Sequence, residues 1–383
     1  MTEKPKICVI AATPLTVHFF FTEHLRQMSK WADVTVVFND QLDTHITISE
    51  KNIRVKHVPI IRKVSVIRDI WALILLMQHI RNERYDMVVT LVPKAGFLGM
   101  MAANLFKTRV RLHIFQGEVW VARFGVARFV FKLADIITAK LATNILAVSH
   151  SERDFLYSHK ITSGKHIDVL GEGSICGVDA KKFSPNKKIA KKQRNAMRIP
   201  DGAVVALFLG RICRDKGVFE LVNVFCKLAR EIPDLWLIIA GPDEENLKSK
   251  LINSVDVDLR TRLIFTGYFQ RPDELINASD FLCLLSHREG FGLSVVEAAA
   301  CGVPSLGTKI HGLSDAIIDA ETGILVSVEN QAEILTGMRQ LSTNARLRSR
   351  LGAKARARAI SLYEKEQVVS AYDRYFHFLL HSQ

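Results

Sequence analysis

Short apolar runs alternate with longer segments of helical periodicity along most of the chain. In the longer segments apolar positions recur every three to four residues, which predicts amphipathic helices at 17–29, 65–83 and 96–106. In the first half of the chain the short runs predict strands at 7–11, 34–38, 55–59, 87–91, 110–115, 144–148 and 167–170. Strands that alternate with helices indicate βαβ units, and therefore a parallel sheet with helices on both faces.

A second series of the same kind follows a polar interval. Residues 181–198 contain eight basic residues and no acidic one, which is typical of a solvated helix and linker face. Further strands are predicted at 204–209, 236–240, 263–265, 281–285 and 304–306, with helices at 217–230, near 246 and at 294–301. We therefore predict an α/β protein of two doubly wound, Rossmann-like domains, residues 1–178 and 179–365.

Composition and charge narrow the class of protein. Hydrophobic residues make up 48% of the 383 positions and charged residues 24%, which is the balance of an ordinary globular protein. The formal charge of +13 indicates an anionic partner, such as nucleic acid, a phosphorylated ligand or an acidic membrane surface. Residues 1–172 hold 23 Lys and Arg against 15 Asp and Glu, so the shorter half carries the larger basic excess.

Neither a targeting segment nor a membrane span is evident in the sequence. The apolar run at 7–12 is too short for the core of a signal peptide, and the run at 70–77 falls well below the roughly 20 residues that span a bilayer. The six cysteines lie far apart without a C-x-x-C pair, as expected of thiols in a reducing compartment. These features predict a cytoplasmic protein that is soluble or lies on a membrane without crossing it.

Two strand-to-helix junctions in the second half carry candidate chemistry. In the segment 289–297, Glu289 and Glu297 flank a glycine-rich turn, and the helix that follows offers free N–H groups and a positive dipole end to a phosphate. In the segment 209–217, Arg211 supplies a forked grip and Lys216 a mobile point charge, a combination that suits a diphosphate. Both segments follow strands of one sheet, at the edge where open α/β folds bind ligands.

These motifs, together with Ala298-Ala-Ala-Cys-Gly-Val-Pro304, resemble those of the retaining glycosyltransferases of family 4. The similarity covers nearly the whole chain and is greatest to the bacterial branch that builds capsule, lipopolysaccharide and O-antigen repeat units. It implies a GT-B fold, in which the two domains face each other across a cleft, and a last helix at 366–383 that packs back on the first domain. It also implies that no metal or other cofactor is required.

The resemblance assigns roles to individual residues. Arg211 and Lys216 would hold the donor diphosphate, Glu297 the ribose and Glu289 the hexose, so that Glu289, Arg211 and Lys216 form the catalytic set. The remaining donor-binding positions would act chiefly through their backbone and are Gly210, Gly290, Phe291, Gly292 and Leu293.

The first half departs from the family pattern. The first strand-helix loop lacks the usual glycine pair, although His18 falls near the expected histidine, and Gln116-Gly117-Glu118 replaces the usual His-Gly. Gln116 and Glu118 are therefore candidate acceptor contacts alongside His18, and Lys94 is either an acceptor-phosphate contact or a surface lysine. His287 stands where an aromatic residue is common in the family, and we expect its ring to serve only in packing.

Basic and aromatic residues in the first half raise the question of a membrane surface. The helix at 67–83 has an apolar stripe that includes Trp71, and its basic flanks begin at Arg62 and Lys63. It is either a core-facing helix or a membrane-surface helix. The segment 123–132 interleaves Arg and Lys with Phe and adds a second basic-aromatic patch.

The sequence therefore predicts a retaining, metal-independent glycosyltransferase at the inner face of the cell membrane. It would move a hexose from a nucleotide diphosphate sugar to a saccharide linked to polyprenyl diphosphate. The hexose could be N-acetylated, and UDP is the favoured nucleotide. The alternatives are a UDP-sugar epimerase or phosphorylase of the same fold, or a non-catalytic partner subunit. We predict no nucleic-acid partner, because Glu289 and Glu297 would repel its phosphates.

Overall fold

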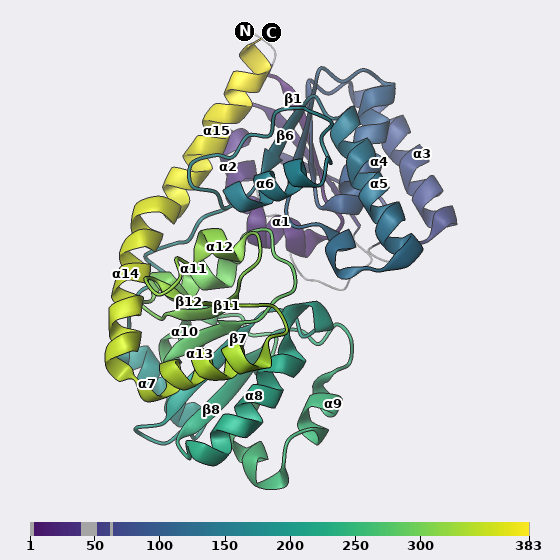
Figure 1. Ribbon diagram of the computed structural model, residues 1–383. Helices are drawn as coiled ribbons and strands as arrows, with labels where there is room; N and C mark the ends of the chain where they lie inside the picture. Colours follow the sequence, from purple (N-terminus) through teal and green to yellow (C-terminus); the bar gives the residue numbers. More distant parts are fainter. Residues whose placement is uncertain (1–3, 40–51, 62–63, 383) are drawn as a thin grey trace. The chain divides into compact units, whose positions relative to one another are not determined.

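The chain folds into two compact units, each built on a six-stranded parallel sheet with helices on both faces (Figure 1). A computed structural model describes residues 4–39, 52–61 and 64–382. The N-terminal unit contains Met1–Cys176 and Glu366–Gln383, and the C-terminal unit contains Gly177–Lys365. The predicted pair of doubly wound α/β domains is confirmed, and the units divide two residues before the predicted boundary.

The N-terminal sheet has the strand order β3-β2-β1-β4-β5-β6. Its strands are β1 (Lys6–Ile10), β2 (Asp33–Phe38), β3 (Ile53–His57), β4 (Met87–Leu91), β5 (Val110–Phe115) and β6 (Asn144–Ala147). The helices are α1 (Pro14–Phe20), α2 (Thr22–Met28), α3 (Val66–Glu83), α4 (Pro93–Leu105), α5 (Gly125–Leu141), α6 (His150–Ser158) and α15 (Lys365–His381). Because parallel crossovers are right-handed, α3, α4 and α5 share one face, while α1 and α2 cover the other.

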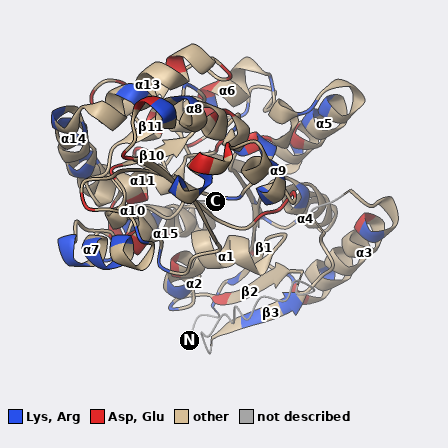
Figure 2. Cartoon of the chain, turned by 90° about the horizontal axis from the view of Figure 1, so that it is seen from below, with Lys and Arg blue, Asp and Glu red and all other residues tan. Residues whose placement is uncertain are grey.

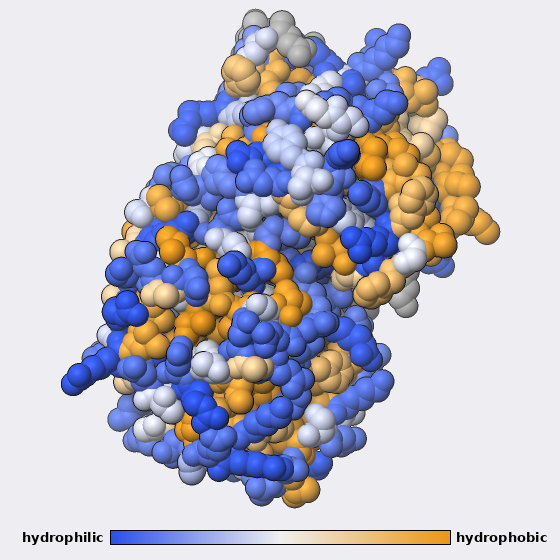
Figure 3. All heavy atoms as spheres, in the orientation of Figure 1, coloured by the Kyte–Doolittle hydropathy of each residue, from blue (hydrophilic) through white to orange (hydrophobic). Residues whose placement is uncertain are grey.

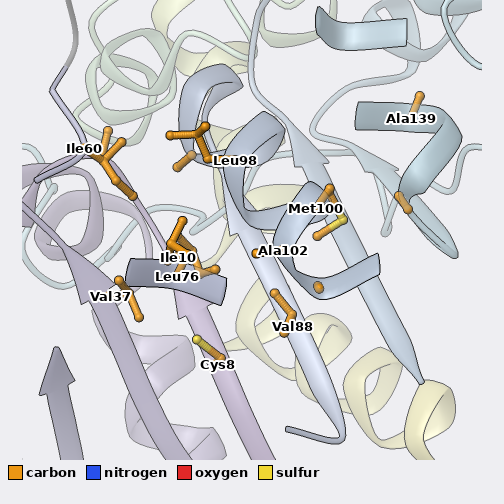
Figure 4. Close-up of a cluster of buried hydrophobic side chains, with 14 of the residues drawn as sticks. Cys8, Ile10, Val37, Ile60, Leu76, Val88, Leu98, Met100, Ala102 and Ala139 are labelled. Carbon is orange, nitrogen blue, oxygen red and sulfur yellow. The ribbon is translucent and has the colours of Figure 1, made fainter. Parts of the chain in front are cut away.

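The core of this unit lies between the sheet and the layer formed by α3, α4 and α5. Figure 4 shows Leu76 of α3 and Met100 of α4 directed onto Ile10 and Val88 of the central strands. All strands of this sheet except β3 are buried on both faces, which explains why they read as continuous apolar runs. On the opposite face α15 packs beside α2, where the Trp31 Nε1–H donates a 2.9 Å hydrogen bond to Asp373.

Three expectations for the N-terminal unit need correction. The strand predicted at 167–170 is wrong, since this segment pairs with β6 only through one isolated bridge. The helix predicted at 17–29 is broken at Phe21, because the Thr22 hydroxyl donates to carbonyls of the preceding turn and so competes with the helical ladder. Helix α5 was not predicted as a helix, because its first half exposes apolar residues where an ordinary surface helix is polar.

The C-terminal sheet has the strand order β12-β11-β10-β7-β8-β9. Its strands are β7 (Val204–Leu209), β8 (Leu235–Ala240), β9 (Leu263–Gly267), β10 (Phe281–Leu284), β11 (Ser305–Thr308) and β12 (Gly323–Val326). The helices are α7 (Lys187–Ala196), α8 (Val218–Glu231), α9 (Lys248–Asn253), α10 (Pro272–Ala278), α11 (Leu293–Ala300), α12 (Leu313–Ala316), α13 (Gln331–Thr343) and α14 (Ala345–Tyr363). The order reverses between β7 and β10, and such a reversal is where ligands bind in open α/β sheets.

Candidate active site

The loops that follow β7 and β10 lie side by side at the carboxyl edge of the C-terminal sheet, because the two strands pair directly. Gly217 closes the first loop with a φ of +67°, and a Cβ atom at this position would lie 2.1 Å from the carbonyl oxygen of Leu285. Only glycine combines this backbone conformation with so close an approach. The two predicted motifs therefore meet through direct contact of their backbones.

Lys216 and Glu289 form an ion pair across these two loops. The Lys216 Nζ donates to Glu289 Oε1, and the Ser286 hydroxyl donates to the same oxygen at 2.9 Å. The two charged side chains are only 14% and 13% exposed, so water screens the pair poorly. The sequence placed both residues at strand ends, and the structure brings their charged groups into contact.

Arg211 has a different carboxylate partner, which the sequence analysis did not identify. Its guanidinium lies 2.5 Å from Glu244, a residue of the loop after β8. The neighbouring Asp243 accepts hydrogen bonds from the amides of Leu247 at 2.8 Å and Lys248 at 2.9 Å, which fixes the start of this loop. Each of the two predicted diphosphate-binding cations therefore has its own carboxylate.

Glycines fix the backbone around these charges. Gly241 has a φ of +142°, and a Cβ atom there would lie 1.8 Å from the carbonyl oxygen of Gly210. Gly312 approaches the second loop in the same way, since its Cβ would lie 2.5 Å from the carbonyl oxygen of Gly290. Gly210 itself has no close neighbour at its Cβ position, so the steric requirement lies in the glycine that approaches it.

Helix α11 begins directly after the glycine-rich turn. Its N-cap is Gly292, at φ +78°, and no side chain caps the amides of the first turn, which begins with Leu293. The aromatic ring of Phe291 is buried and meets Tyr363 edge-on at 5.0 Å, so Phe291 offers a ligand only its backbone. The segment from Gly290 to Leu293 therefore presents backbone groups at a positive helix end, where an anion is favoured.

Glu297 lies one turn further along α11 and stands apart from the paired charges. It is half-buried, and no side chain in the described part of the chain forms a hydrogen bond or ion pair with its carboxyl group. Burial raises the pKa of Glu297 to about 8, an effect that Lys182 reduces and Asp273 reinforces. At neutral pH this carboxyl group is largely protonated and can both donate and accept a hydrogen bond.

The interpretation of His287 as packing is wrong. Its ring lies between two carboxylates, with Nε2 at 3.3 Å from Glu220 and Nδ1 at 3.7 Å from Glu329. Hydrogen bonding of the ring N–H to the Glu220 carboxylate raises the pKa of His287, which favours the doubly protonated ring. The side chains of Glu220, His287 and Glu329 lie close enough together to hold a metal ion. The two carboxylates, however, contact different nitrogens of the ring, as expected for a protonated imidazolium and not for ligands that converge on one metal ion.

Asp215 links the two loops a second time. Its carbonyl oxygen accepts the amide of His287 at 2.8 Å, and its carboxylate pairs with Arg288 at 3.0 Å. Asp215 and Arg288 were not predicted as site residues, although both motifs alternate acidic and basic residues, which was the available signal. Their contacts hold the loop that carries Glu289 against the loop that carries Lys216.

The four acceptor candidates lie in the loops and helices that follow β1, β4 and β5 of the N-terminal sheet. Lys94 lies in the first turn of α4, where its ammonium group forms an ion pair with Asp69 of α3 at 2.8 and 2.9 Å. His18 is exposed on α1. The side-chain amide nitrogen of Gln116 is buried and has no hydrogen-bond partner among the described residues.

Glu118 differs from the other three because it is wholly buried. Its charge and the burial of the site raise the pKa of Asp135 to about 8, with burial the larger cause, while the Trp120 Nε1–H donates to Asp135 at 3.0 Å. This environment suits a structural carboxyl group better than an acceptor contact. We therefore retain His18, Lys94 and Gln116 as the acceptor candidates.

Several known proteins are similar to this chain in sequence. Residues 190–358 match the family described as glycosyl transferases group 1. The chain is 26% identical over 333 residues to the capsular polysaccharide biosynthesis glycosyltransferase CapM of Staphylococcus aureus, covering 85% of this chain and 87% of that one. It is 24% identical over 305 residues to the UDP-Gal:alpha-D-GlcNAc-diphosphoundecaprenol alpha-1,3-galactosyltransferase of Escherichia coli, covering 76% and 78%.

A solved structure shares the fold along nearly the whole chain. Sucrose-phosphate synthase from Thermosynechococcus elongatus superimposes with a TM-score of 0.84 at 18% identity, covering 99% of this chain and 100% of that one. At that identity the likeness bears on the fold alone. Residues 190–358 match the group 1 glycosyl transferases, and glycosyltransferases are similar to most of the chain. The protein is a glycosyltransferase made of two Rossmann-like units of the GT-B fold.

Proposed function

We propose that this glycosyltransferase moves a hexose, with retention of its anomeric configuration, from UDP to a saccharide linked to polyprenyl diphosphate. The observation that carries the proposal is the contact between Lys216 and Glu289 at the reversal point of the C-terminal sheet, within the segment that matches the family. The names of the two relatives, one a capsule enzyme and the other a transferase from UDP-Gal to a diphosphoundecaprenol acceptor, support the choice of donor and acceptor class.

The donor diphosphate binds Arg211 and Lys216 in this proposal. Its oxygens compete with the carboxylates of Glu244 and Glu289, so each cation exchanges an internal partner for a phosphate when the donor binds. The uncapped start of α11 adds backbone donors and a positive dipole end. Three sources of positive charge then stabilise the departing nucleoside diphosphate, and no metal ion is needed for this purpose.

Glu297 and Glu289 take different parts of the donor. The Glu297 carboxyl, largely protonated at neutral pH, offers a ribose hydroxyl both a donor and an acceptor. Glu289, released from Lys216 by the incoming phosphate, accepts hydrogen bonds from the hydroxyls of the hexose. The backbone from Gly290 to Leu293 lies between these two carboxyl groups in the sequence and contacts the hexose and the phosphates.

The transfer step follows a front-face course that conserves the configuration of the sugar. The bond between hexose C1 and the diphosphate oxygen breaks while the acceptor hydroxyl oxygen bonds to C1 on the same face. The hydroxyl proton passes to an oxygen of the departing phosphate. Since that phosphate acts as the base, the chain requires no side-chain base, in keeping with Gln116-Gly117-Glu118 in place of the usual His-Gly.

The acceptor binds the N-terminal unit. Lys94 contacts a phosphate of the lipid carrier, and the unpaired amide of Gln116 donates to the acceptor saccharide. A polyprenyl carrier is held in a bilayer, so the enzyme works at the inner, anionic face of the cell membrane. The product extends a capsule, lipopolysaccharide or O-antigen repeat unit.

A two-stage experiment tests the proposed function. Thermal shift with UDP-, GDP- and TDP-hexoses first identifies the donor, since a ligand at 100 times its Kd stabilises the folded state by about 2.7 kcal/mol. The donor is then incubated with polyprenyl diphosphate saccharides, and NMR of the product reads the anomeric configuration. An inverted product contradicts retention, and turnover of the UDP-sugar without acceptor favours the epimerase. Absence of UDP-sugar binding contradicts the donor assignment.

A further inference from the structure

Two helices of the N-terminal unit expose more apolar surface than the fold requires. In α3 the exposed residues include Ile67, which is 83% exposed, and Trp71, which is 56% exposed. In and before α5 they include Phe124, which is 85% exposed, and Phe129. We name the following set the α3/α5 surface: Val64, Val66, Ile67, Ile70, Trp71, Ile74, Phe124, Val126, Phe129, Val130 and Leu133.

The apolar residues of this surface do not serve the core. The core-facing side of α3 is formed by Ala72, Leu76 and Ile80, four residues apart, and Ile67, Ile70 and Trp71 are exposed away from it. Residues 123–130 of the α5 region are all exposed, and the buried residues of α5 begin only at Asp135. A surface helix is normally polar where it meets water, so a concentration of apolar residues marks a site of interaction.

The two parts of the α3/α5 surface lie on one layer and at one edge of it. Both helices pack against α4, and each exposes its apolar residues in its first half. The first halves lie at the carboxyl edge of the sheet, because each of these helices comes after one parallel strand and leads into the next (Figure 1). In Figure 3, hydrophobic side chains gather over these helices at the upper right.

Charge distinguishes this surface from an ordinary protein interface. Residues 119–134 contain Arg123, Arg128 and Lys132 and no acidic residue. Arg128 and Lys132 lie over the ring of Trp120, at 5.6 and 5.5 Å from its centre, which holds both cations on one side of α5. Apolar side chains beside fixed cations match an anionic bilayer, whose acyl chains take the former and whose headgroup phosphates take the latter.

The same edge carries the acceptor candidate Lys94. Asp69, in the first turn of α3, holds Lys94 at 2.8 Å and is the one acidic residue between 64 and 82, so its negative charge is compensated within the protein. A bilayer at the α3/α5 surface would therefore meet no uncompensated carboxylate from these two segments. It would also bring lipid headgroups to the helix layer from which Lys94 projects.

We infer that the α3/α5 surface docks the N-terminal unit on an anionic lipid bilayer through inserted apolar side chains and the cations Arg123, Arg128 and Lys132. The inference rests on the proposed function only in identifying the lipid as the membrane of the acceptor. A second copy of the chain fits this surface poorly, because a two-fold contact would bring two sets of three cations into one apolar interface. No helix in the described part of the chain is long and apolar enough to cross a membrane.

Vesicle flotation of the full chain tests the electrostatic part. We expect binding to phosphatidylglycerol–phosphatidylethanolamine vesicles at low salt, weak binding to phosphatidylcholine, and weaker binding to both at 1 M salt, where the Debye length is about 3 Å. The variant Arg123→Gln/Arg128→Gln/Lys132→Gln should bind on the order of 100-fold more weakly, at about fivefold for each cation lost. Wild type that stays unbound to anionic vesicles at low salt overturns the inference.

A matched control removes three cations from another helix. Lys187, Lys188 and Lys191 are exposed on α7, which is conspicuously basic in Figure 2 but carries no large exposed apolar side chain. The variant Lys187→Gln/Lys188→Gln/Lys191→Gln should change binding less than about threefold, within the range expected of distant screened charges. Equal losses in the two triple variants would mean that net charge alone attracts the protein, and would overturn the α3/α5 surface.

Fluorescence tests insertion of the apolar side chains. A blue shift on vesicle binding should be present in wild type and should disappear in Trp71→Phe, which keeps an apolar ring at the position and should still float with vesicles. Ile67→Ser/Phe124→Ser should lower binding at least tenfold and remove the part that survives high salt. A blue shift that persists in Trp71→Phe, or a Ser variant that binds like wild type, contradicts insertion.

The outcomes separate docking from the proposed function. Vesicle binding without transfer to a lipid-linked saccharide leaves the α3/α5 surface standing and overturns the acceptor. If the protein transfers the hexose to a detergent-solubilised acceptor but does not bind vesicles, docking is contradicted and the proposed function is retained. Sedimentation equilibrium without lipid completes the test, because a dimer that Ile67→Ser/Phe124→Ser dissociates would assign the surface to a second copy of this chain instead.

Discussion

The carboxyl edges of the two sheets differ in how they hold charge. At the C-terminal edge Lys216 pairs with Glu289 and Arg211 with Glu244, and the loops that carry them are pressed together through Gly217. At the N-terminal edge the candidates share no such arrangement. Lys94 is held by a neighbouring helix, and Gln116 has a buried amide without a partner. The C-terminal edge therefore holds paired charges, whereas the candidates at the N-terminal edge each lie in a different environment, beside exposed apolar helices.

Under the proposed function, this difference reflects what each edge would recognise. A nucleoside diphosphate presents the same phosphates and ribose to every enzyme that uses it, so fixed loops with fixed charges suit it, and the constraint is visible as residue spacing. An acceptor saccharide on a lipid varies in its sugars and lies in a membrane. Its recognition depends on surface placement, which spacing along the chain does not encode.

The largest effect should come from removing a cation at the C-terminal edge. Lys216→Ala deletes charge that would stabilise the departing diphosphate and leaves Glu289 poorly screened, so kcat should fall about 100- to 1000-fold. Lys94→Ala, the matched change in the N-terminal unit, should raise the KM for the acceptor and leave the donor affinity unchanged. Steady-state kinetics with both substrates measure this. If the two variants changed donor affinity and kcat equally, the two edges would not differ in their roles.

The contrast also explains what the sequence could predict. Most strands were predictable because burial on both faces makes them continuous apolar runs. The four site residues Arg211, Lys216, Glu289 and Glu297 were predictable because they follow strands or glycine turns. Glu244, the partner of Arg211, was not predictable. It comes from the loop after another strand, and only the folded sheet brings the two residues together.

Errors in the N-terminal unit have a different cause. Residues 167–170 have the composition of a strand, yet they find only one bridging partner at the edge of the sheet. Helix α5 lacks the polar face that periodicity analysis requires, because its first half is exposed and apolar. Arg62 and Lys63, which were assigned to the basic flank of α3, lie outside the described residues. The wrong strand at 167–170 and the missed helix α5 have the same cause, because tertiary contacts decide the secondary structure there and the local sequence pattern does not.

The contact between the two loops of the C-terminal edge can be broken at one glycine. Gly217→Ala combines positive φ with a Cβ 2.1 Å from a carbonyl oxygen, so the free energy of unfolding should fall by about 3 kcal/mol and UDP binding should weaken. Gly202→Ala is the control, because φ is +89° there but nothing lies within 4 Å of the added Cβ. It should cost only about 1 kcal/mol of backbone strain. Similar losses in urea titrations would show that strain, not loop contact, explains Gly217.

Glu297 should respond to substitution as a protonated group. Because burial raises its pKa to about 8, Glu297→Gln should keep nucleotide affinity within about threefold at pH 7, whereas Glu297→Ala should lose about tenfold, equivalent to one hydrogen bond of ~1.4 kcal/mol. Calorimetry with UDP gives both values. Glu289→Ala should instead lower turnover more than UDP affinity. If Gln is as damaging as Ala at pH 7, the carboxyl is ionised in the complex; if neither matters, Glu297 does not contact the ribose.

The smallest effect should come from His287, whose ring lies between Glu220 and Glu329 beside the paired loops. Hydrogen bonding to Glu220 raises the pKa of His287 in the folded protein, so the charged ring stabilises the fold fully below the unfolded pKa of about 6.5 and this stabilisation disappears as pH rises through the higher folded value. Because Glu329 is exposed, the contribution should not exceed about 1 kcal/mol. The difference in unfolding free energy between wild type and His287→Asn should therefore be largest near pH 5.5 and smallest near pH 8.5 in urea titrations. Glu220→Gln, which removes the main cause of the shift, should show the same pH dependence as His287→Asn, and a difference that grows with pH would contradict the ion pair.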